Sequence, residues 1–339
     1  MPTNRDPFDV LTEAWEPRIR QAFIDAVRRI TDRASITLLE DRLRKGDVEG
    51  AVRALGLDPS DFYGLRDAVV SAYGEGGKAF AETVPAGRDP GGALLRIVFD
   101  IRNPRAERWI ADKSSTLVRE IVDRQKEMVR ANLLAGVSAG KNPRTTALDL
   151  VGRISPGSKQ RTGGVLGLTS GQEEWQRRYE AELASGDPAA LRNALTRGLR
   201  DKRFDRTVLK AIETGEPIPA DIRAKMVTAY RNRSLKFRAD TIARTESIRA
   251  LGASQAEAYD QAIERGQVKE SAIKKFWVTA GDERVRHTHR LIPGMNADGR
   301  GWREAFDTPT GPSMHAPHDV DIMCRCREVV RINRFVGLE

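Results

Sequence analysis

The stretch from Trp277 to Ile332 decides how the chain is organised. It reads W-V-T-A-G-D-E-R-V-R-H-T-H-R-L-I-P-G at 277–294 and M-H-A-P-H-D-V-D-I-M-C-R-C-R-E-V-V-R-I at 314–332. Every histidine and cysteine of the 339-residue chain lies inside this stretch: His287, His289, His315, His318, Cys324 and Cys326. Imidazole and thiolate are the side chains that bind zinc-like metals best, so this clustering predicts a specialised centre.

Two interpretations of the cluster stay open at the level of sequence. One is a structural Zn²⁺ site, with His289, His318, Cys324 and Cys326 as ligands and with Asp282, His287 and His315 as alternates. The other is a hydrogen-bonded core, because loop histidines often bind backbone groups and a Cys-x-Cys pair can fill a small apolar space. The spacing fits no standard zinc finger, since neither C-x-x-C nor H-x3-H occurs in the stretch.

The end of the stretch has the pattern of a strand. C-R-C-R-E-V-V-R-I at 324–332 alternates and finishes in β-branched residues, which predicts that Cys324 and Cys326 share one face. K-K-F-W-V-T-A at 274–280 predicts a partner strand. We therefore expect a short antiparallel sheet whose two strands are joined by a long irregular excursion.

The rest of the chain has helical periodicity. Pro17 suits the first residue of a helix, and a long amphipathic helix is expected from about Asn103 to Ala135. The glycines in G-E-G-G-K at 74–78 predict a loop, because no P-loop pattern and no preceding strand accompany them. The expected fold class is α+β, with predominantly α-helical N-terminal and middle regions and a small C-terminal α+β unit containing a short antiparallel sheet.

Four segments are expected along the chain. They are a helical N-terminal region at 1–100, a long helix with a helix-loop-helix at 101–155, a Gly/Ser-rich loop and basic helical insertion at 156–235, and a C-terminal domain at 236–339. Residues 155–171, rich in Gly, Ser, Thr and Pro, are expected to form a mobile loop or linker.

The chain carries a net charge of +9 and a sequence pI near 9.7. A basic surface can serve DNA through phosphate neutralisation. The most basic region supplies the candidate DNA contacts, which are Arg197, Arg200, Lys202, Arg203 and Arg206. The competing interpretation is a solvated helix face, since no aromatic residues interleave these charges as a single-strand stacking platform requires.

The composition also bears on where in the cell the protein resides. No apolar run approaches the roughly 20 residues of a membrane span, and the N-terminus has no apolar signal segment. Two cysteines in one tripeptide are typical of a protein in a reducing cytosol rather than of a disulfide framework. No membrane partner is therefore expected.

Five motifs occur in a characteristic order along the chain. They are an expected helix start at Ala243-Arg244-Thr245-Glu246, then Trp277, then Asp282 with Arg286 and His289, then His315-Ala316-Pro317-His318, and finally Cys324-Arg325-Cys326. In this order they resemble the phage head morphogenesis proteins, the group that includes the Mu F protein and the minor head protein of SPP1-like phages. The resemblance covers about the last hundred residues, and it marks Arg244, Glu246, Trp277, Asp282 and Arg286 as structural motif residues.

The resemblance implies a minor head protein rather than an enzyme. Such a protein acts in head assembly, resides in the virion head and in the host cytoplasm during assembly, and has the portal and major capsid or scaffold proteins as partners, with phage DNA as a further candidate. The alternative is a metal-dependent hydrolase or nuclease, in which His287 and His289 hold an ion and Asp282 or Glu283 activates water. Arg244 and Glu246 are expected to pair with residues such as Asp282 or Arg286.

Overall fold

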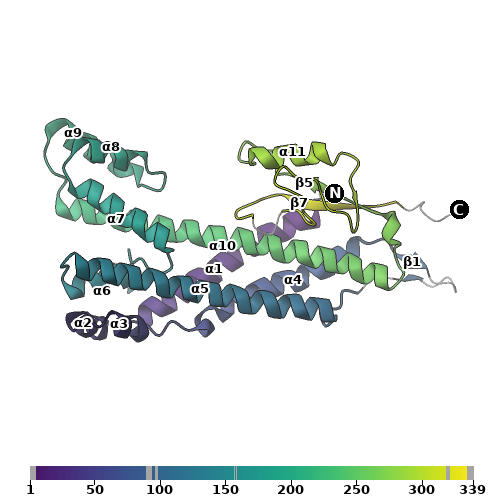
Figure 1. Ribbon diagram of the computed structural model, residues 1–339, viewed down its shortest axis with the longest axis horizontal. Helices are drawn as coiled ribbons and strands as arrows, with labels where there is room; N and C mark the ends of the chain where they lie inside the picture. Colours follow the sequence, from purple (N-terminus) through teal and green to yellow (C-terminus); the bar gives the residue numbers. More distant parts are fainter. Residues whose placement is uncertain are drawn as a thin grey trace. The chain divides into compact units, whose positions relative to one another are not determined.

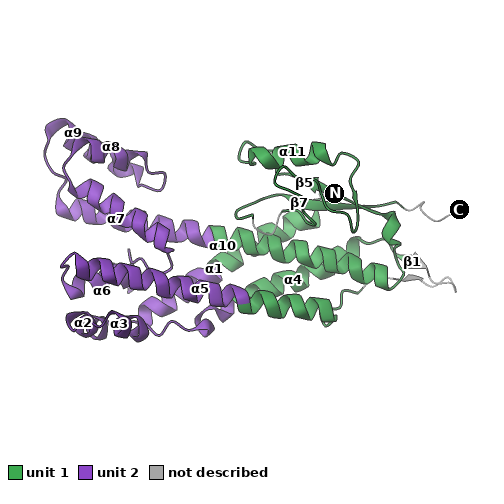
Figure 2. Cartoon of the chain, viewed as in Figure 1, with its two compact units in different colours: residues 1–20, 65–115, 241–339 green, residues 21–64, 116–240 purple. Residues whose placement is uncertain are grey.

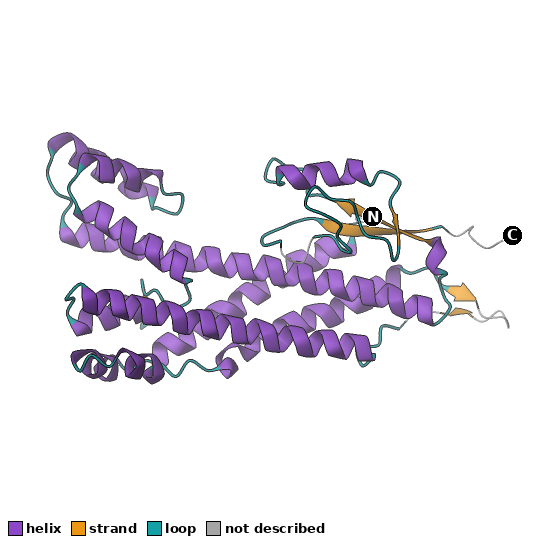
Figure 3. Ribbon diagram, viewed as in Figure 1, coloured by secondary structure: helices purple, strands orange, loops and turns teal. Residues whose placement is uncertain are grey.

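The computed structural model describes residues 5–88, 94–95, 98–155, 157, 159–317 and 321–333 (Figure 1). About 66% of the structure is helical, and the few strands are short (Figure 3). The expected fold class, α+β with a predominance of helices, is confirmed.

Two compact units make up the chain (Figure 2). Unit 1 comprises Met1–Arg20, Leu65–Ser115 and Thr241–Glu339, and unit 2 comprises Gln21–Gly64 and Thr116–Asp240. These units cut across the four segments expected from the sequence, because each unit gathers segments that are distant along the chain.

The α-helices are α1 (Pro7–Arg33), α2 (Ile36–Arg44), α3 (Val48–Ala54), α4 (Tyr63–Thr83), α5 (Pro104–Ser138), α6 (Pro143–Val151), α7 (Ser170–Ala184), α8 (Pro188–Thr196), α9 (Asp205–Thr214), α10 (Ala220–Glu264) and α11 (His287–Met295). Short 3₁₀ turns occupy Pro59–Phe62, Lys202–Phe204 and Glu270–Ala272. The long helix expected from about residue 103 is confirmed as α5.

Three helical expectations need correction. Pro17 lies inside α1, which begins ten residues earlier at Pro7. The glycines of G-E-G-G-K belong to the helix α4 rather than to a loop. Glycine is needed there because the neighbours leave no room for a side chain: a Cβ on Gly77 would lie 2.3 Å from the Phe99 ring. The A-R-T-E motif lies in the middle of the 45-residue helix α10 rather than at a helix start.

The sheet of the C-terminal region has the order β6-β5-β7. Strand β5 (Ile273–Val278) pairs antiparallel with β7 (Arg327–Ile332) over six residue pairs, from Ile273 opposite Ile332 to Val278 opposite Arg327. Strand β6 (Arg300–Gly301) pairs with the other edge of β5. Two further antiparallel pairs are β1 (Gly87–Arg88) with β2 (Leu94–Leu95) and β3 (Arg153–Ile154) with β4 (Arg161–Thr162). The expected pairing of the two long strands is confirmed.

The Gly-rich stretch at 155–171 is not a free linker in its second half. Val165, Leu166 and Leu168 are buried. The Gln125 side chain accepts from the Gly167 backbone N–H and donates to the Leu168 carbonyl, each over 2.8 Å. Glycine is required here for close packing and a positive φ of 89° at Gly167, so composition alone gave the wrong expectation.

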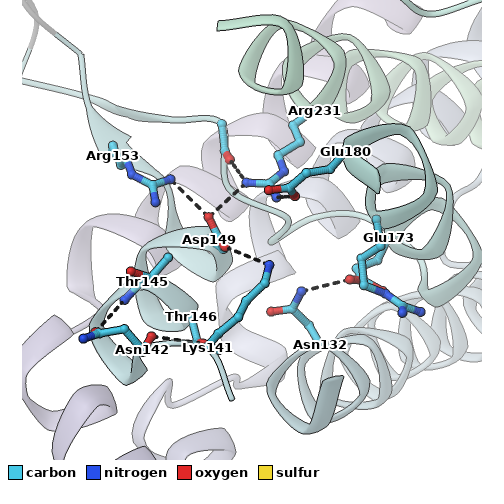
Figure 4. Close-up of polar contacts among 12 residues, drawn as sticks. Asn132, Lys141, Asn142, Thr145, Thr146, Asp149, Arg153, Glu173, Glu180 and Arg231 are labelled. Carbon is cyan, nitrogen blue, oxygen red and sulfur yellow. Dashed lines mark hydrogen bonds and ion pairs between the residues drawn. The ribbon is translucent and has the colours of Figure 1, made fainter. Parts of the chain in front are cut away.

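Unit 2 contains a buried polar network beside its apolar core. The Arg231 guanidinium, whose side chain is only 6% exposed, contacts Asp149 Oδ1 at 3.4 Å, Glu180 Oε2 at 3.3 Å and the Gly163 carbonyl at 3.1 Å. Figure 4 shows Asp149 also approached by Arg153. Buried charges are tolerated when they are paired and hydrogen-bonded in this way.

Among the described residues, no helix combines the length and the apolar character that crossing a membrane demands.

Candidate functional site

The candidate site is built around β5 and α11 in unit 1. Trp277, near the end of β5, is buried and packs edge-on against His289 and Phe306, with ring centroids 6.0 and 5.5 Å away. Ile292 of α11, Ala316 and both cysteines complete this apolar cluster. Apolar side chains therefore cover one side of the site, and the low dielectric there strengthens any polar interaction made inside it.

Three potential metal-ligating side chains converge within this cluster. His289 Nδ1 lies 3.4 Å from Cys324 Sγ and 3.4 Å from Cys326 Sγ. All three donor atoms lie within 4.8 Å of one another, and all three residues are buried. His289 comes from α11 and the cysteines from the segment that enters β7, so the fold joins donors 35 and 37 residues apart.

The cysteines lie before the strand rather than in it. Strand β7 begins at Arg327, and Met323 has a φ of 60°, which turns the chain immediately before Cys324. The Cys326 backbone N–H points to Cys324 Sγ over 3.4 Å. The expectation that both cysteines lie in the strand was wrong, because this left-handed residue and N–H···S contact replace ladder pairing. The two sulfurs nevertheless approach the same histidine nitrogen.

The thiols strongly influence each other. The Cys326 thiol donates to Cys324 and lowers the pKa of Cys324 to about 6, and the Cys326 backbone N–H acts in the same direction. The same interaction, together with burial, raises the pKa of Cys326 above its ordinary value. One thiolate is thus stabilised inside a largely buried pair, and thiolate is the form that binds metals.

The carboxylate of Asp321 contacts the other ring nitrogen of His289. Asp321 Oδ2 lies 3.3 Å from His289 Nε2, and Asp321 Oδ1 lies 3.3 Å from the Arg286 guanidinium. The 3.3 Å separation is that of an ion pair rather than of an aligned hydrogen bond, and a ring proton on Nε2 would leave the Nδ1 lone pair facing the sulfurs. The sequence interpretation missed Asp321, although it lies three residues before Cys324.

The alternates for the ligand set are placed elsewhere. His287 is exposed, and His315 Nδ1 lies 3.3 Å from Glu328 Oε1 on a side chain that is half exposed. Asp282 is held by Arg325. His318 lies outside the described residues. The structure therefore brings together three of the four expected ligands and leaves the fourth untested.

Asp282 and Arg325 form a two-bond ion pair. The Arg325 guanidinium donates to both Asp282 oxygens, over 2.6 and 2.7 Å. These bonds lower the pKa of Asp282 to about 2. Arg286 reaches Asp321 rather than Arg244 or Glu246, so the pairing expected from the sequence is not the one formed.

The A-R-T-E motif has its own partners within unit 1. Arg244 pairs with Glu16 at 2.8 Å, and the buried Glu246 pairs with Lys113 at 3.1 Å. Thr245 Oγ1 accepts the Met323 backbone N–H over 3.1 Å. Ion pairs with the N-terminal helix and α5 carry no local sequence signal, which explains why they were missed.

The candidate DNA contacts in unit 2 are mostly neutralised within the chain. Arg197 binds Glu182, Arg200 binds Asp205 and Arg203 binds Asp201. Lys202 and Arg206 are exposed. Arg203 is also exposed but is paired with Asp201, so Lys202 and Arg206 are the most available of the five for a phosphate.

The structure defines a mostly helical protein with a small C-terminal α+β region that contains a His-Cys-Cys cluster. A hydrogen bond from Met323 to Thr245 links the cysteine segment to the long helix α10. The family described as phage Mu protein F like protein matches residues 188–329, which confirms the resemblance to the phage head morphogenesis proteins. The matched segment begins at Pro188, well before the first motif at Ala243. No curated protein and no solved structure matches the chain.

Proposed function

We propose that the protein is a minor head protein of a phage, associated with the portal or the inner capsid, that acts in head assembly. The observation that carries the proposal is the Mu F-like match at 188–329. The match includes the A-R-T-E motif and the C-R-C segment, and the Thr245–Met323 hydrogen bond links them in space. A protein of this kind resides in the virion head and in the host cytoplasm during assembly.

Assembly of heads from defined components tests this role. The full chain would be co-expressed with the portal, scaffold and major capsid proteins of the same genome, and its copies per purified head counted by mass spectrometry. We expect fewer copies of the chain than of the capsid protein. Heads made without the portal would lose the chain if it binds the portal and keep it if it binds the inner capsid. Absence of the chain from heads of both kinds would contradict the proposal.

Contact with packaged DNA is a second element of the proposal. It is supported by the net charge of +9 and by the exposed Lys202 and Arg206. Replacing both with Ala should weaken duplex binding about equally for all sequences and reduce the salt dependence of the affinity, because phosphate contacts carry no sequence information. Fluorescence anisotropy across a salt series measures both quantities.

The matched control for DNA binding is Lys78→Ala, which removes an exposed charge from α4. The control should retain the parental affinity and salt slope. If the double variant behaves like this control, Lys202 and Arg206 do not contact DNA.

The hydrolase alternative receives less support from the geometry. The cavity beside the His-Cys-Cys cluster is lined by Ala280, Arg284, Val285, Arg286, His289, Met323, Cys324, Arg325 and Cys326. Among these lining residues there is no carboxylate that could act as a general base towards a bound water. The matched family is also one of head assembly rather than of catalysis.

A further inference from the structure

The three donor atoms of the His-Cys-Cys cluster have the spacing of a tetrahedral metal site. Zinc binds thiolate at about 2.3 Å and imidazole nitrogen at about 2.0–2.1 Å, so tetrahedral angles place N and S about 3.5 Å apart. Both N···S distances here are 3.4 Å. The three donor atoms also lie within 4.8 Å of one another, so they can converge on one ion, and an S₂N donor set favours zinc over the harder cations.

Two N–H groups lie in the same cluster as the sulfurs. The Cys326 backbone N–H contacts Cys324 Sγ. Trp277 Nε1 is buried in the same cluster as Cys326 and forms no hydrogen bond with a described atom. A buried indole N–H without an acceptor is costly, and a metal-bound thiolate would satisfy it. A pair of neutral thiols would leave this donor poorly matched.

The histidine is oriented by a second group, as in many metal sites. Asp321 contacts His289 Nε2 and is itself held by Arg286. Metal-ligating histidines almost always donate their other ring N–H to a carboxylate, a carbonyl or a water. A histidine that only filled a core would not need its Nδ1 aimed at two sulfurs.

The three donor residues line a cavity from which a fourth ligand can be supplied. A cavity of about 200 Å³ adjoins His289, Cys324 and Cys326 and is lined by Arg284 and Arg286. This volume accommodates a water molecule or another small oxygen donor. The described residues therefore supply three protein donors and leave one coordination position open.

We propose that His289 Nδ1, Cys324 Sγ and Cys326 Sγ bind one zinc ion, with Asp321 as the positioning residue for His289. The site goes beyond the role in head assembly and does not depend on it. The zinc ties α11 to the entry of β7 and so fixes the long excursion between β5 and β7. Because such a site forms only in the folded state, the free energy of zinc binding contributes directly to folding and can order a segment of this length.

Elemental analysis of the full chain tests the ligand set. The protein would be purified without chelators, and we expect one zinc per chain. Cys326→Ser and His289→Ala should each lose most of it. The matched control is His287→Ala, two residues away on the same helix and exposed, which should retain the full amount. A parental chain without transition metal, or ligand variants that retain it, would overturn the proposal.

Cobalt substitution keeps the test decisive if the ligand variants fold poorly. Co²⁺ added to the zinc-depleted parental chain should give the intense visible bands of tetrahedral cobalt and a sulfur-to-cobalt charge-transfer band of two thiolates. His287→Ala should give the same spectrum. Weak octahedral bands alone, without charge transfer, would show that the cysteines are not ligands.

Asp321→Asn tests the positioning role separately. It keeps the size of the side chain but removes the charge behind His289 Nε2, and the loss of such a group typically weakens metal binding 10- to 100-fold. The cobalt spectrum should keep its shape, since the three ligands are unchanged. Competition with a chelating dye measures the zinc affinity. An affinity within threefold of the parental chain would exclude the positioning role.

Discussion

Thr245 Oγ1 accepts a hydrogen bond from the backbone N–H of Met323 over 3.1 Å. The bond joins two segments that are 78 residues apart, the middle of α10 and the turn that precedes Cys324. Met323 has a φ of 60°, a conformation that non-glycine residues adopt only with support from their surroundings. The threonine of A-R-T-E therefore helps to hold the cysteine segment in place.

Thr245→Val should destabilise unit 1 by about 1–3 kcal/mol, because the isosteric valine leaves the Met323 N–H without an acceptor. Thr245→Ser keeps the hydroxyl and loses one methyl group, which costs about 0.8 kcal/mol. Hydrogen exchange at Met323 and in α10 measures the difference. Equal losses in the two variants would mean that the hydroxyl does not support the turn.

Asp282 should make unit 1 sensitive to acid within a defined range. Its pKa is lowered from 3.8 to about 2 by Arg325, so the folded state binds the proton less readily than the unfolded chain. The stabilisation is fully present above about pH 4 and is lost as the pH falls towards 2. Asp282→Asn should flatten the stability curve across this range in urea unfolding at stepped pH.

The control for the acid response is Asp298→Asn, at an exposed position where no ion pair with a described residue is formed. This variant should follow the parental curve. If Asp282→Asn also follows it, the Arg325 pair does not persist in solution.

Gly77→Ala should destabilise the protein although alanine favours helices. The added Cβ would lie 2.3 Å from the ring of the buried Phe99, and such overpacking typically costs about 1–3 kcal/mol. Gly64→Ala, in the same helix α4 with no atom within 4 Å, should stabilise by up to about 1 kcal/mol. Thermal unfolding of the two variants should therefore shift in opposite directions.

Arg231→Met should destabilise unit 2 by about 1–3 kcal/mol, because it removes the buried partner of Asp149, which keeps only Arg153 and Lys141. Arg178→Met removes an exposed partner of Glu174 on α7 and should cost less, about 0.5 kcal/mol or below. Hydrogen exchange in α6 and α7 measures the two losses within the unit. A cost for Arg231→Met no greater than for Arg178→Met would show that the network in Figure 4 contributes little.

The local patterns predicted much of the fold. Periodicity alone located the long helix α5, and alternation located β5 and β7 and their pairing. Clustering of residue types indicated a set of candidate ligands, of which His289, Cys324 and Cys326 converge in the structure. These signals are local, because the period of a helix or strand and the clustering of ligand-type side chains can both be recognised within a short window of sequence.

The failures concern contacts between distant segments. The Gly74–Lys78 stretch has the composition of a loop, yet close packing against α10 and Phe99 requires its glycines within a helix. Asp321 could not be singled out, since any acidic residue near the cluster was an equal candidate. Arg327 pairs with Asp6 at 2.6 Å and with Asp9 at 3.1 Å, more than 300 residues away. No sequence pattern indicates such a pair.

The three-segment composition of unit 1 also has a consequence for biosynthesis. The N-terminal turn that carries Asp6 and Asp9 leaves the ribosome early, whereas Arg327 and β7 are made after nearly all of the described chain. Unit 1 therefore cannot fold completely while only its first two segments have been translated. Their apolar surfaces stay exposed until the third segment, 241–339, has been made. Unit 2 is complete once residue 240 has emerged, so it can mature before unit 1.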